Sequence, residues 1–278
     1  MKFIIFRDQL VDNTAMLYLN HNINQCPDHE CKILNHTAPI YEVMDTERPD
    51  VVVASLESFP EHLMVYLSQN KVNLITYSGS KNSSMVDKFA QILKDENIDV
   101  SFFFGPLEEK SVKAKYIRLN HAHDVGMQMP PMNFKHPKAV IVGANTDVES
   151  IRDIYENDYV HIINMNPKAN IQVLKPDINN HIQMIAGLLH CYEEVIYANM
   201  ADFSEQILFE SLVRANKTYV IYNNEAQKES HRKVFGDFDL DYSSKDKIKD
   251  FTEIKKVVQE KHNSIKRTKS FLSQVPKK

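Results

Sequence analysis

Two carboxylates eight residues apart, Asp202 and Glu210, have the spacing best suited to bind a ligand in this sequence. An apolar run at 195–198 and an amphipathic stretch at 204–214 predict a strand and a helix around them. Glu210 falls about two turns into that helix, where its carboxylate can accept hydrogen bonds from two ribose hydroxyls. The helix N-terminus offers free N–H groups and a positive dipole end to a diphosphate. The stretch can therefore present a carboxylate to hydroxyl groups and a helix N-terminus to a phosphate.

The ends of this helix carry their own signals. Ser204 is expected to cap its start, with Asp202 just outside it, and Asn216 is expected to end it in the left-handed conformation. The alternative is an ordinary surface helix, in which Glu210 is solvated and Asp202 is a simple cap.

A general base for an acceptor hydroxyl would come from a loop that follows a strand. Asp8, directly after the predicted strand 2–6, is the first candidate, and Glu57 and Asp124 come next. A turn former before the first helix explains Asp8 equally well. His123, in the segment that joins the two halves of the chain, is a further catalytic candidate.

Ser78, Gly79 and Ser80 follow the predicted strand 73–77. Their hydroxyl and backbone groups can bind an acceptor or a sugar through hydrogen bonds, although a simple turn explains them equally well.

Three histidines and two cysteines lie between residues 21 and 36, but their spacing does not match that of the ligand pairs in zinc knuckles. Cys31 enters a predicted strand, where a buried thiol is common. We therefore expect no metal site in this set, which comprises His21, Cys26, His29, Cys31 and His36.

Glycine is scarce, with 6 residues in 278, where average usage would give about twenty. Neither G-x-G-x-x-G nor G-x-x-x-x-G-K-[ST] occurs, which excludes dinucleotide fingerprints and P-loops. A phosphate site must then rest on a helix N-terminus. We expect Asn to replace Gly where positive φ is needed.

Short β-rich apolar runs alternate with amphipathic stretches along the chain, as in βαβ units. The expected strands are 2–6, 32–35, 50–54, 73–77, 100–104, 116–119, 139–142, 159–164, 171–174, 194–198, 218–222 and 238–242. The expected helices are 14–24, 60–69, 83–96, 148–155, 181–190, 204–214, 225–234 and one long tail from Lys245. Ligands sit at the carboxyl ends of such strands. The candidate loops are therefore 7–13, 55–59, 78–83, 143–147 and 199–204.

The periodicity stops in a turn-rich linker at 121–137 and then restarts. We expect an α/β protein of two Rossmann-like, doubly wound domains facing a cleft. The expected division is a first domain at 1–132, a second at 133–250 and a basic C-terminal helix at 251–278; the resemblance described below implies that the first is the acceptor side and the second binds the nucleotide sugar.

The stretch 195–224 resembles the nucleotide-sugar-binding half of GT-B glycosyltransferases, of the glycosyltransferase group 1 type. That family has an acidic residue, Phe-Gly and a helix with Glu eight positions after the acid; here Phe203 and Ser204 replace Phe-Gly. Gly143 resembles the start of the phosphate loop, and the basic tail resembles the helix that crosses back to the first domain. The donor-binding residues that the resemblance implies are Gly143, Asn145, Thr146, Asn199, Phe203, Ser204 and Glu210, with Asp202 as a catalytic residue.

The resemblance implies transfer of a sugar from a nucleoside-diphosphate sugar, a UDP-sugar above all, with retention of configuration favoured and no further cofactor. The acceptor stays open between DNA, a cell-surface polymer and a protein. Retaining members carry Arg and Lys after the first strand of this domain, whereas 143–147 has neither, and the next is Arg152. A catalytically inactive GT-B-like protein that binds a nucleotide or a partner is therefore the alternative.

Charge is uneven along the chain. From Lys245 to Lys278 there are 11 Lys and Arg against 4 Asp and Glu, so the tail carries about +7 and the remainder about −11. This basic tail could bind DNA, or it could simply form a helix face exposed to solvent. No apolar run approaches the roughly 18 residues of a membrane span, and three cysteines form no disulfide framework. We expect a cytoplasmic protein.

Overall fold

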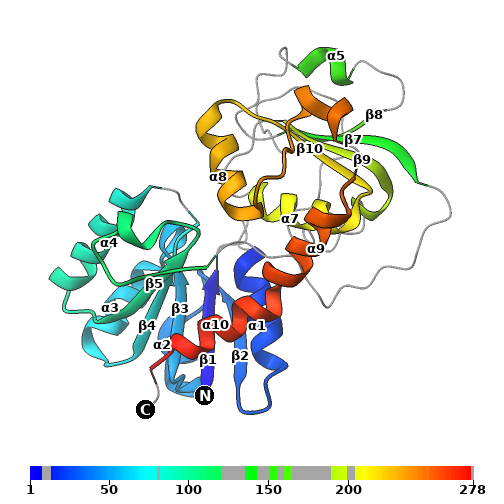
Figure 1. The fold of residues 1–278 in the computed structure, drawn as a ribbon. Coiled ribbons are helices and arrows are strands. Elements are labelled where there is room, and N and C mark those ends of the chain that lie inside the picture. Colours follow the sequence, from blue (N-terminus) through cyan, green and yellow to red (C-terminus); the bar gives the residue numbers. More distant parts are fainter. Residues whose placement is uncertain are drawn as a thin grey trace. The chain divides into compact units, whose positions relative to one another are not determined.

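The computed structural model describes residues 1–7, 14–79, 82–119, 135–142, 151–155, 160–164, 189–198, 204–248 and 250–276. The chain divides into two compact units, one of Met1–His121 with Ser264–Lys278 and one of Ala122–Asn263 (Figure 1). Each unit contains a parallel sheet with helices, which confirms the predicted α/β class. The predicted boundary between 132 and 133 lies outside the described residues. Among those that are described, no helix is long and apolar enough to cross a membrane.

Six parallel strands form the sheet of the first unit, in the spatial order β2-β1-β3-β4-β5-β6. Their bounds are Lys2–Arg7 (β1), Glu30–Asn35 (β2), Val51–Ser55 (β3), Asn73–Tyr77 (β4), Val100–Gly105 (β5) and Tyr116–Arg118 (β6). Phe6 of β1 lies opposite Leu34 of β2 on one side and Ala54 of β3 on the other. The winding therefore reverses between β1 and β3, which makes that point the topological switch of the sheet.

Helices cover both faces of this sheet (Figure 1). Phe3 and Ile5 of β1 join the core that includes α1 and α10, whereas Ile4 and Phe6 join the core that includes α2, α3 and α4. Burial on both faces explains why these strands read as continuous apolar runs. The helices are Thr14–Asn24 (α1), Ile40–Glu47 (α2), Glu61–Gln69 (α3), Ser83–Asp95 (α4) and Ser264–Gln274 (α10), with short 3₁₀ turns at Leu56–Ser58 and Glu109–Ser111.

Helix α2 is absent from the expected elements. It has eight residues, begins after Pro39 with no capping side chain and buries Ile40 and Met44. Arg48 ends it with φ of 46°, in the left-handed region. A helix this short, without a cap, leaves too weak a pattern in the sequence to be recognised.

The second unit has four parallel strands in the order β10-β9-β7-β8. Their bounds are His136–Val142 (β7), Val160–Asn164 (β8), Tyr192–Ala198 (β9) and Lys217–Ile221 (β10). Strand β7 thus begins inside the stretch that was expected to be a linker. Val142 lies opposite Asn164 of β8 and Ala198 of β9, so the winding reverses between β7 and β9.

The helices of the second unit pack on this sheet through one apolar core. Leu208 and Leu212 of α7 share that core with Ile254 and Val258 of α9 and with Val195 of β9. The bounds are Arg152–Tyr155 (α5), Ser204–Arg214 (α7), Glu225–Phe235 (α8) and Thr252–Lys261 (α9), with a 3₁₀ helix at Tyr242–Lys247. The expected strand 171–174 and most of the expected helix 181–190 lie outside the described residues.

The expectation of one long helical tail from Lys245 is wrong. Helix α9 ends at Lys261, His262 leaves helical geometry with φ −119° and ψ 43°, and α10 starts at Ser264. The physical reason is that the two helices serve different cores: α9 buries Ile254 and Val258 in the second unit, and α10 buries Phe271 in the first.

Asparagine was expected to replace glycine where the backbone needs a positive φ. The structure shows this at Asn97 but not at Asn216. Asn97, just after α4, has φ of 58°, as expected for a left-handed residue at a helix end. Asn216 is not left-handed, because Arg48 and Asn97 are the non-glycine residues with positive φ in the described part of the chain. Its side chain instead accepts a hydrogen bond from Lys135 at 3.1 Å and donates one to Glu193.

The last expected strand, 238–242, is also different in the structure. It makes a single bridge between Asp241 and Val220, and Tyr242 already begins the 3₁₀ helix.

Candidate functional site

The two segments predicted to hold a sugar nucleotide leave from neighbouring strand ends. Strand β7 ends at Val142 and β9 at Ala198, and these residues lie opposite each other at the topological switch of the second sheet. Doubly wound sheets bind ligands at this place. The predicted residues of these segments lie outside the described residues: Gly143, Asn145, Thr146, Asn199, Asp202 and Phe203.

Helix α7, which follows β9, begins at Ser204 and ends at Arg214, as predicted. Glu210 is buried in it, with its side chain 4% exposed, so the alternative of a solvated Glu210 is wrong. Its Oε2 accepts a hydrogen bond from Nε of Arg214 at 2.9 Å, one turn later in the helix. The contact with Arg214 therefore holds this carboxyl group in one orientation.

Further polar groups lie buried beneath α7. The hydroxyls of Tyr197 in β9 and Ser211 in α7 form a hydrogen bond. Burial raises the pKa of Tyr197 well above its usual range; the bond to Ser211 acts in the opposite direction, and the negative charge of Glu210 adds to the increase. Buried polar groups of this kind fix side-chain positions when they are hydrogen-bonded. The cluster thus gives α7 a fixed position on β9.

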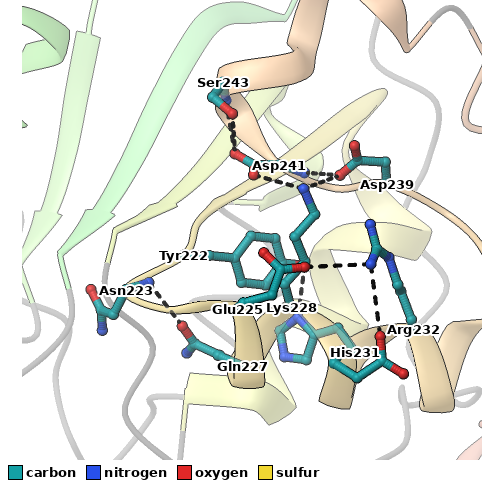
Figure 2. A network of polar contacts seen from close by, with 11 residues as sticks. Tyr222, Asn223, Glu225, Gln227, Lys228, His231, Arg232, Asp239, Asp241 and Ser243 are labelled. Atoms are coloured by element: carbon teal, nitrogen blue, oxygen red, sulfur yellow. Dashed lines mark hydrogen bonds and ion pairs between the residues drawn. The ribbon is translucent and has the colours of Figure 1, made fainter.

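A second polar network ties the chain after α8 to the edge of the same sheet (Figure 2). Nζ of Lys228 lies 2.9 Å from Oδ2 of Asp241 and 3.4 Å from Oδ1 of Asp239. Beside it, the N–H of Val220 in β10 donates to the carbonyl of Leu240 at 2.7 Å. Lys228 therefore neutralises two carboxylates while the backbone extends the sheet beyond β10.

Replacing Lys228 with methionine is expected to lower the free energy of unfolding by about 1–2 kcal/mol at neutral pH, because hydrogen bonds to charged groups contribute about that much. Burial raises the pKa of Asp241, but hydrogen bonds from Lys228 and Ser243 lower it more, so its pKa lies below the usual value. Its contribution is present above the unfolded pKa of about 3.9 and is lost as the pH falls through the folded pKa. Urea unfolding between pH 7 and pH 2 measures both effects.

The matched control for this variant is Lys233→Met on the exposed side of the same helix. It is expected to change stability by less than about 0.5 kcal/mol and to keep the full acid dependence. If the free energy of unfolding fell by the same amount below pH 4 in Lys228→Met as in the wild type, the proposed role of this ion pair would be contradicted.

In the first unit, the structure brings Glu57 and Ser78 together at the carboxyl end of the sheet. Oγ of Ser55 donates to Oε2 of Glu57 at 2.8 Å, and Oγ of Ser78 donates to Oε1 at 3.2 Å. Both serines are fully buried, and Glu57 is half-buried. Ser55 ends β3, next to the switch point between β1 and β3. A carboxylate with both oxygens held in this way is a preorganised hydrogen-bond acceptor.

Close backbone packing supports this group from behind. A Cβ added to Gly105 would lie 2.6 Å from Oη of Tyr116 and still closer to the carbonyl oxygen of Ser78, so only glycine fits there. Burial raises the pKa of Tyr116, and the nearby charge of Glu57 adds to that increase. The ends of β4, β5 and β6 therefore form one packed layer beside Glu57.

Of the remaining predicted site residues, the structure describes Gly79 but not Asp8, Ser80 or His123. Gly79 is described and packs against the ring of Tyr77, whose Oη would be 3.3 Å from an added Cβ. Asp8, Ser80 and His123 lie outside the described residues.

The histidines and cysteines between 21 and 36 do not gather into a group of three potential metal ligands in the described part of the chain. Cys31 is buried in β2 as predicted, and burial raises the pKa of its thiol to about 12, far from the thiolate that zinc needs. Within the described ranges, no three His, Cys, Asp or Glu side chains group as metal ligands would.

Two contacts in these groups were not predicted, that of Arg214 with Glu210 and that of Ser55 with Glu57, and one of them had a signal in the sequence. Arg214 is four residues after Glu210, the spacing at which helical ion pairs form. Ser55 has no such signal, because its role depends on how β3 lies beside β4.

Comparison with known proteins shows the fold of this chain. No protein-family model and no curated protein matches it. Among solved structures, it is similar to a kitacinnamycin glycotransferase at 10% identity, with 99% of this chain and 98% of that chain covered and a TM-score of 0.53. It is also similar to MnaA of S. aureus, solved with UDP, at 10% identity, with 98% and 94% covered and a TM-score of 0.57.

A third similar structure is the glycosyltransferase SnogD from Streptomyces nogalater, at 9% identity, with 99% of this chain and 96% of that chain covered and a TM-score of 0.51. The chain thus has the GT-B fold that the resemblance implied. Identities this low establish the fold alone.

Proposed function

We propose that this protein is a glycosyltransferase that moves a sugar from a nucleoside-diphosphate sugar to a hydroxyl acceptor. The observation that carries the proposal is the second sheet. Strands β7 and β9 end side by side at Val142 and Ala198, at the topological switch of this sheet within a GT-B fold, and the proposed donor-binding residues follow them in the sequence. A UDP-sugar is the proposed donor, and no further cofactor is invoked.

The proposed roles follow the chemistry of sugar transfer, in which the leaving diphosphate gains negative charge. The N-terminal N–H groups of α7 and the segment after β7 would bind the diphosphate. Glu210 would accept hydrogen bonds from the ribose, and Asp202 would act at the sugar, with retention of configuration favoured. Asp8 and His123 are the proposed catalytic groups on the acceptor side.

The second candidate is a catalytically inactive GT-B-like protein that binds a nucleotide or a partner. The observation that favours it lies in the sequence: 143–147 contains no Arg or Lys to balance the charge of a leaving diphosphate.

We propose that the protein is cytoplasmic. We consider three acceptors: DNA, a cell-surface polymer and a protein. DNA depends on the basic C-terminal region, which is split between the two units rather than forming one basic helix.

Calorimetry with UDP, TDP and their sugar conjugates, followed by assays of donor hydrolysis, tests the proposal. We expect at least one donor to bind and to be slowly hydrolysed. Binding without turnover in the presence of any acceptor would favour the inactive candidate. Failure to bind any nucleotide would contradict the enzyme and the nucleotide-binding form of the second candidate.

A further inference from the structure

We infer that His136 and His161, which we call the histidine pair, make the second unit sensitive to mild acid: they join β7 to β8 while both rings are neutral, and uptake of protons weakens that contact. The observation behind this is that the two imidazole rings stack face to face. Their centroids lie 3.5 Å apart, with 24° between the ring planes. Histidine is the side chain whose charge ordinarily changes between pH 5 and pH 8.

The histidine pair lies at the amino end of the second sheet. His136 is the first residue of β7, and His161 is the second residue of β8. The pairing of the two strands begins close by, with Lys138 opposite Val160. Strand β8 comes last in the order β10-β9-β7-β8, so its sheet hydrogen bonds within the described ranges go to β7. The stacked rings therefore help to hold the start of an outer strand, and His161 is exposed, so protons can reach it.

Tyr192 of β9 favours the neutral form of His161. Its ring contacts both imidazoles edge-on, with centroids 5.7 Å from His136 and 5.8 Å from His161, and its hydroxyl lies 3.1 Å from Nδ1 of His161. Tyr192 is buried, so its hydroxyl proton needs an acceptor, and the lone pair of a neutral imidazole nitrogen provides one. A protonated ring has an N–H at this place, and Tyr192 then loses its acceptor.

The surroundings of His136 add a second obstacle to protonation. Its Nδ1 is buried and has no hydrogen-bond partner in the described part of the chain. A neutral ring can keep its single proton on Nε2, whereas the cation carries an N–H on both nitrogens. The backbone of His136 is fixed, because its N–H donates to the carbonyl of Cys191 at 2.7 Å. Protonation would therefore leave a buried N–H without an acceptor, which costs free energy.

The two rings also act on each other through their charges. Burial lowers the pKa of His161, and the positive charge of His136 lowers it further. Two positive charges on rings this close repel each other even in water, and more strongly in a partly buried place. The pair therefore takes up its protons in two coupled steps, and the doubly charged state opposes the stack.

The elements around the pair supply no compensating charge to His161 among the described residues, since the charge that acts on it is that of His136. On β7 and β9, Nζ of Lys138 lies 3.4 Å from Oε1 of Glu194. Lys135 and Glu193 are both hydrogen-bonded to Asn216. The charged and titratable side chains next to the pair, on β7, β9 and α5 and directly before β7 and β9, are Lys135, Lys138, Arg152, Asp153, His190, Cys191, Glu193 and Glu194.

Mild acid is expected to destabilise the second unit. The pKa of His161 is lower in the folded chain than the value of about 6.5 that it takes in the unfolded chain, so the unfolded chain binds the proton first as the pH falls. The contribution of the pair is complete above about pH 6.5, decreases below it and is lost as the pH falls through the folded pKa.

Urea unfolding of the full chain at pH 7, 6 and 5, followed by circular dichroism, tests this with His161→Gln. Glutamine does not titrate and keeps an oxygen that can accept from Tyr192. We expect the equilibrium constant of unfolding to increase from pH 7 to pH 5 at least about fivefold more in the wild type than in His161→Gln. The chain has 12 histidines, so the readout is this difference and not the total pH dependence.

Further variants separate the pair from the other histidines. His136→Gln is expected to remove the same pH dependence, and the double variant is expected to differ from either single variant by less than about twofold, because the effect belongs to the pair. His136→Gln also carries the test if His161→Gln does not fold. His62→Gln makes the same chemical change at an exposed position of α3 and is expected to keep the wild-type dependence.

Three results would overturn the inference. The first is that His161→Gln keeps the wild-type change between pH 7 and pH 5. The second is that His62→Gln reduces that change by the same factor. The third is that the effects of His136→Gln and His161→Gln simply add in the double variant, as two independent histidines would.

Discussion

Replacing Glu210 with alanine is expected to lower the free energy of unfolding by about 3–5 kcal/mol, because the variant leaves a buried arginine without its carboxylate. The side chains of Glu210 and Arg214 are 4% and 6% exposed, and their Nε–Oε2 distance is 2.9 Å. Urea unfolding followed by circular dichroism measures the loss.

The control for this variant is the same substitution in an exposed pair. Glu229 is 52% exposed and lies 3.7 Å from Arg232 on α8. Glu229→Ala is expected to cost less than about 1 kcal/mol, the usual contribution of a surface ion pair. Adding Arg214→Met to Glu210→Ala is expected to restore part of the stability, since the buried guanidinium that lost its carboxylate is then removed as well. A loss as small as that of Glu229→Ala would contradict the buried pair.

The same pair determines how the proposed donor site must be tested. Loss of UDP binding in Glu210→Ala would mix local unfolding with loss of a ribose contact. Glu210→Gln keeps the size of the side chain and an oxygen that can accept from Arg214. Binding of UDP to the folded fraction of that variant therefore reports on the proposed contact with the ribose.

The sequence was most informative where local pattern and tertiary packing agree. Helix α7 has the predicted bounds, because its apolar residues recur at helical spacing and Leu208 and Leu212 both reach the core. Strands β7 and β9, which precede the predicted loops 143–147 and 199–204, were also recognised, because a strand buried on both faces is a short apolar run. The fold class followed from the alternation of these two patterns.

The parts that could not be predicted depend on contacts between distant residues. Glu57 and Ser78 are 21 residues apart and meet only because β3 pairs with β4 in a fixed register. The spacing of Glu210 and Arg214 was visible, but their burial depends on how α7 lies on β9. The tail was expected to be one helix because its charge pattern is continuous, whereas its apolar residues enter two separate cores.

Replacing Phe271 with alanine is expected to destabilise the first unit by about 3–5 kcal/mol, the usual cost of removing a buried phenylalanine. Phe271 is fully buried, and its ring centroid lies 5.1 Å from that of Phe104, 5.9 Å from Phe102 and 6.4 Å from Phe3. Those partners come from β1 and β5, so α10 completes a core begun at the other end of the sequence.

The control on the same helix is Ile265→Ala, because Ile265 is 42% exposed and its loss leaves no cavity in the core. Urea unfolding and limited proteolysis of the two variants compare the positions directly. If α10 is part of the first unit, only Phe271→Ala exposes cleavage sites in β1 and β5 at low urea. Equal and small effects would instead mean that the segment after Asn263 is a dispensable extension of the second unit, and that the core of the first unit is complete without it.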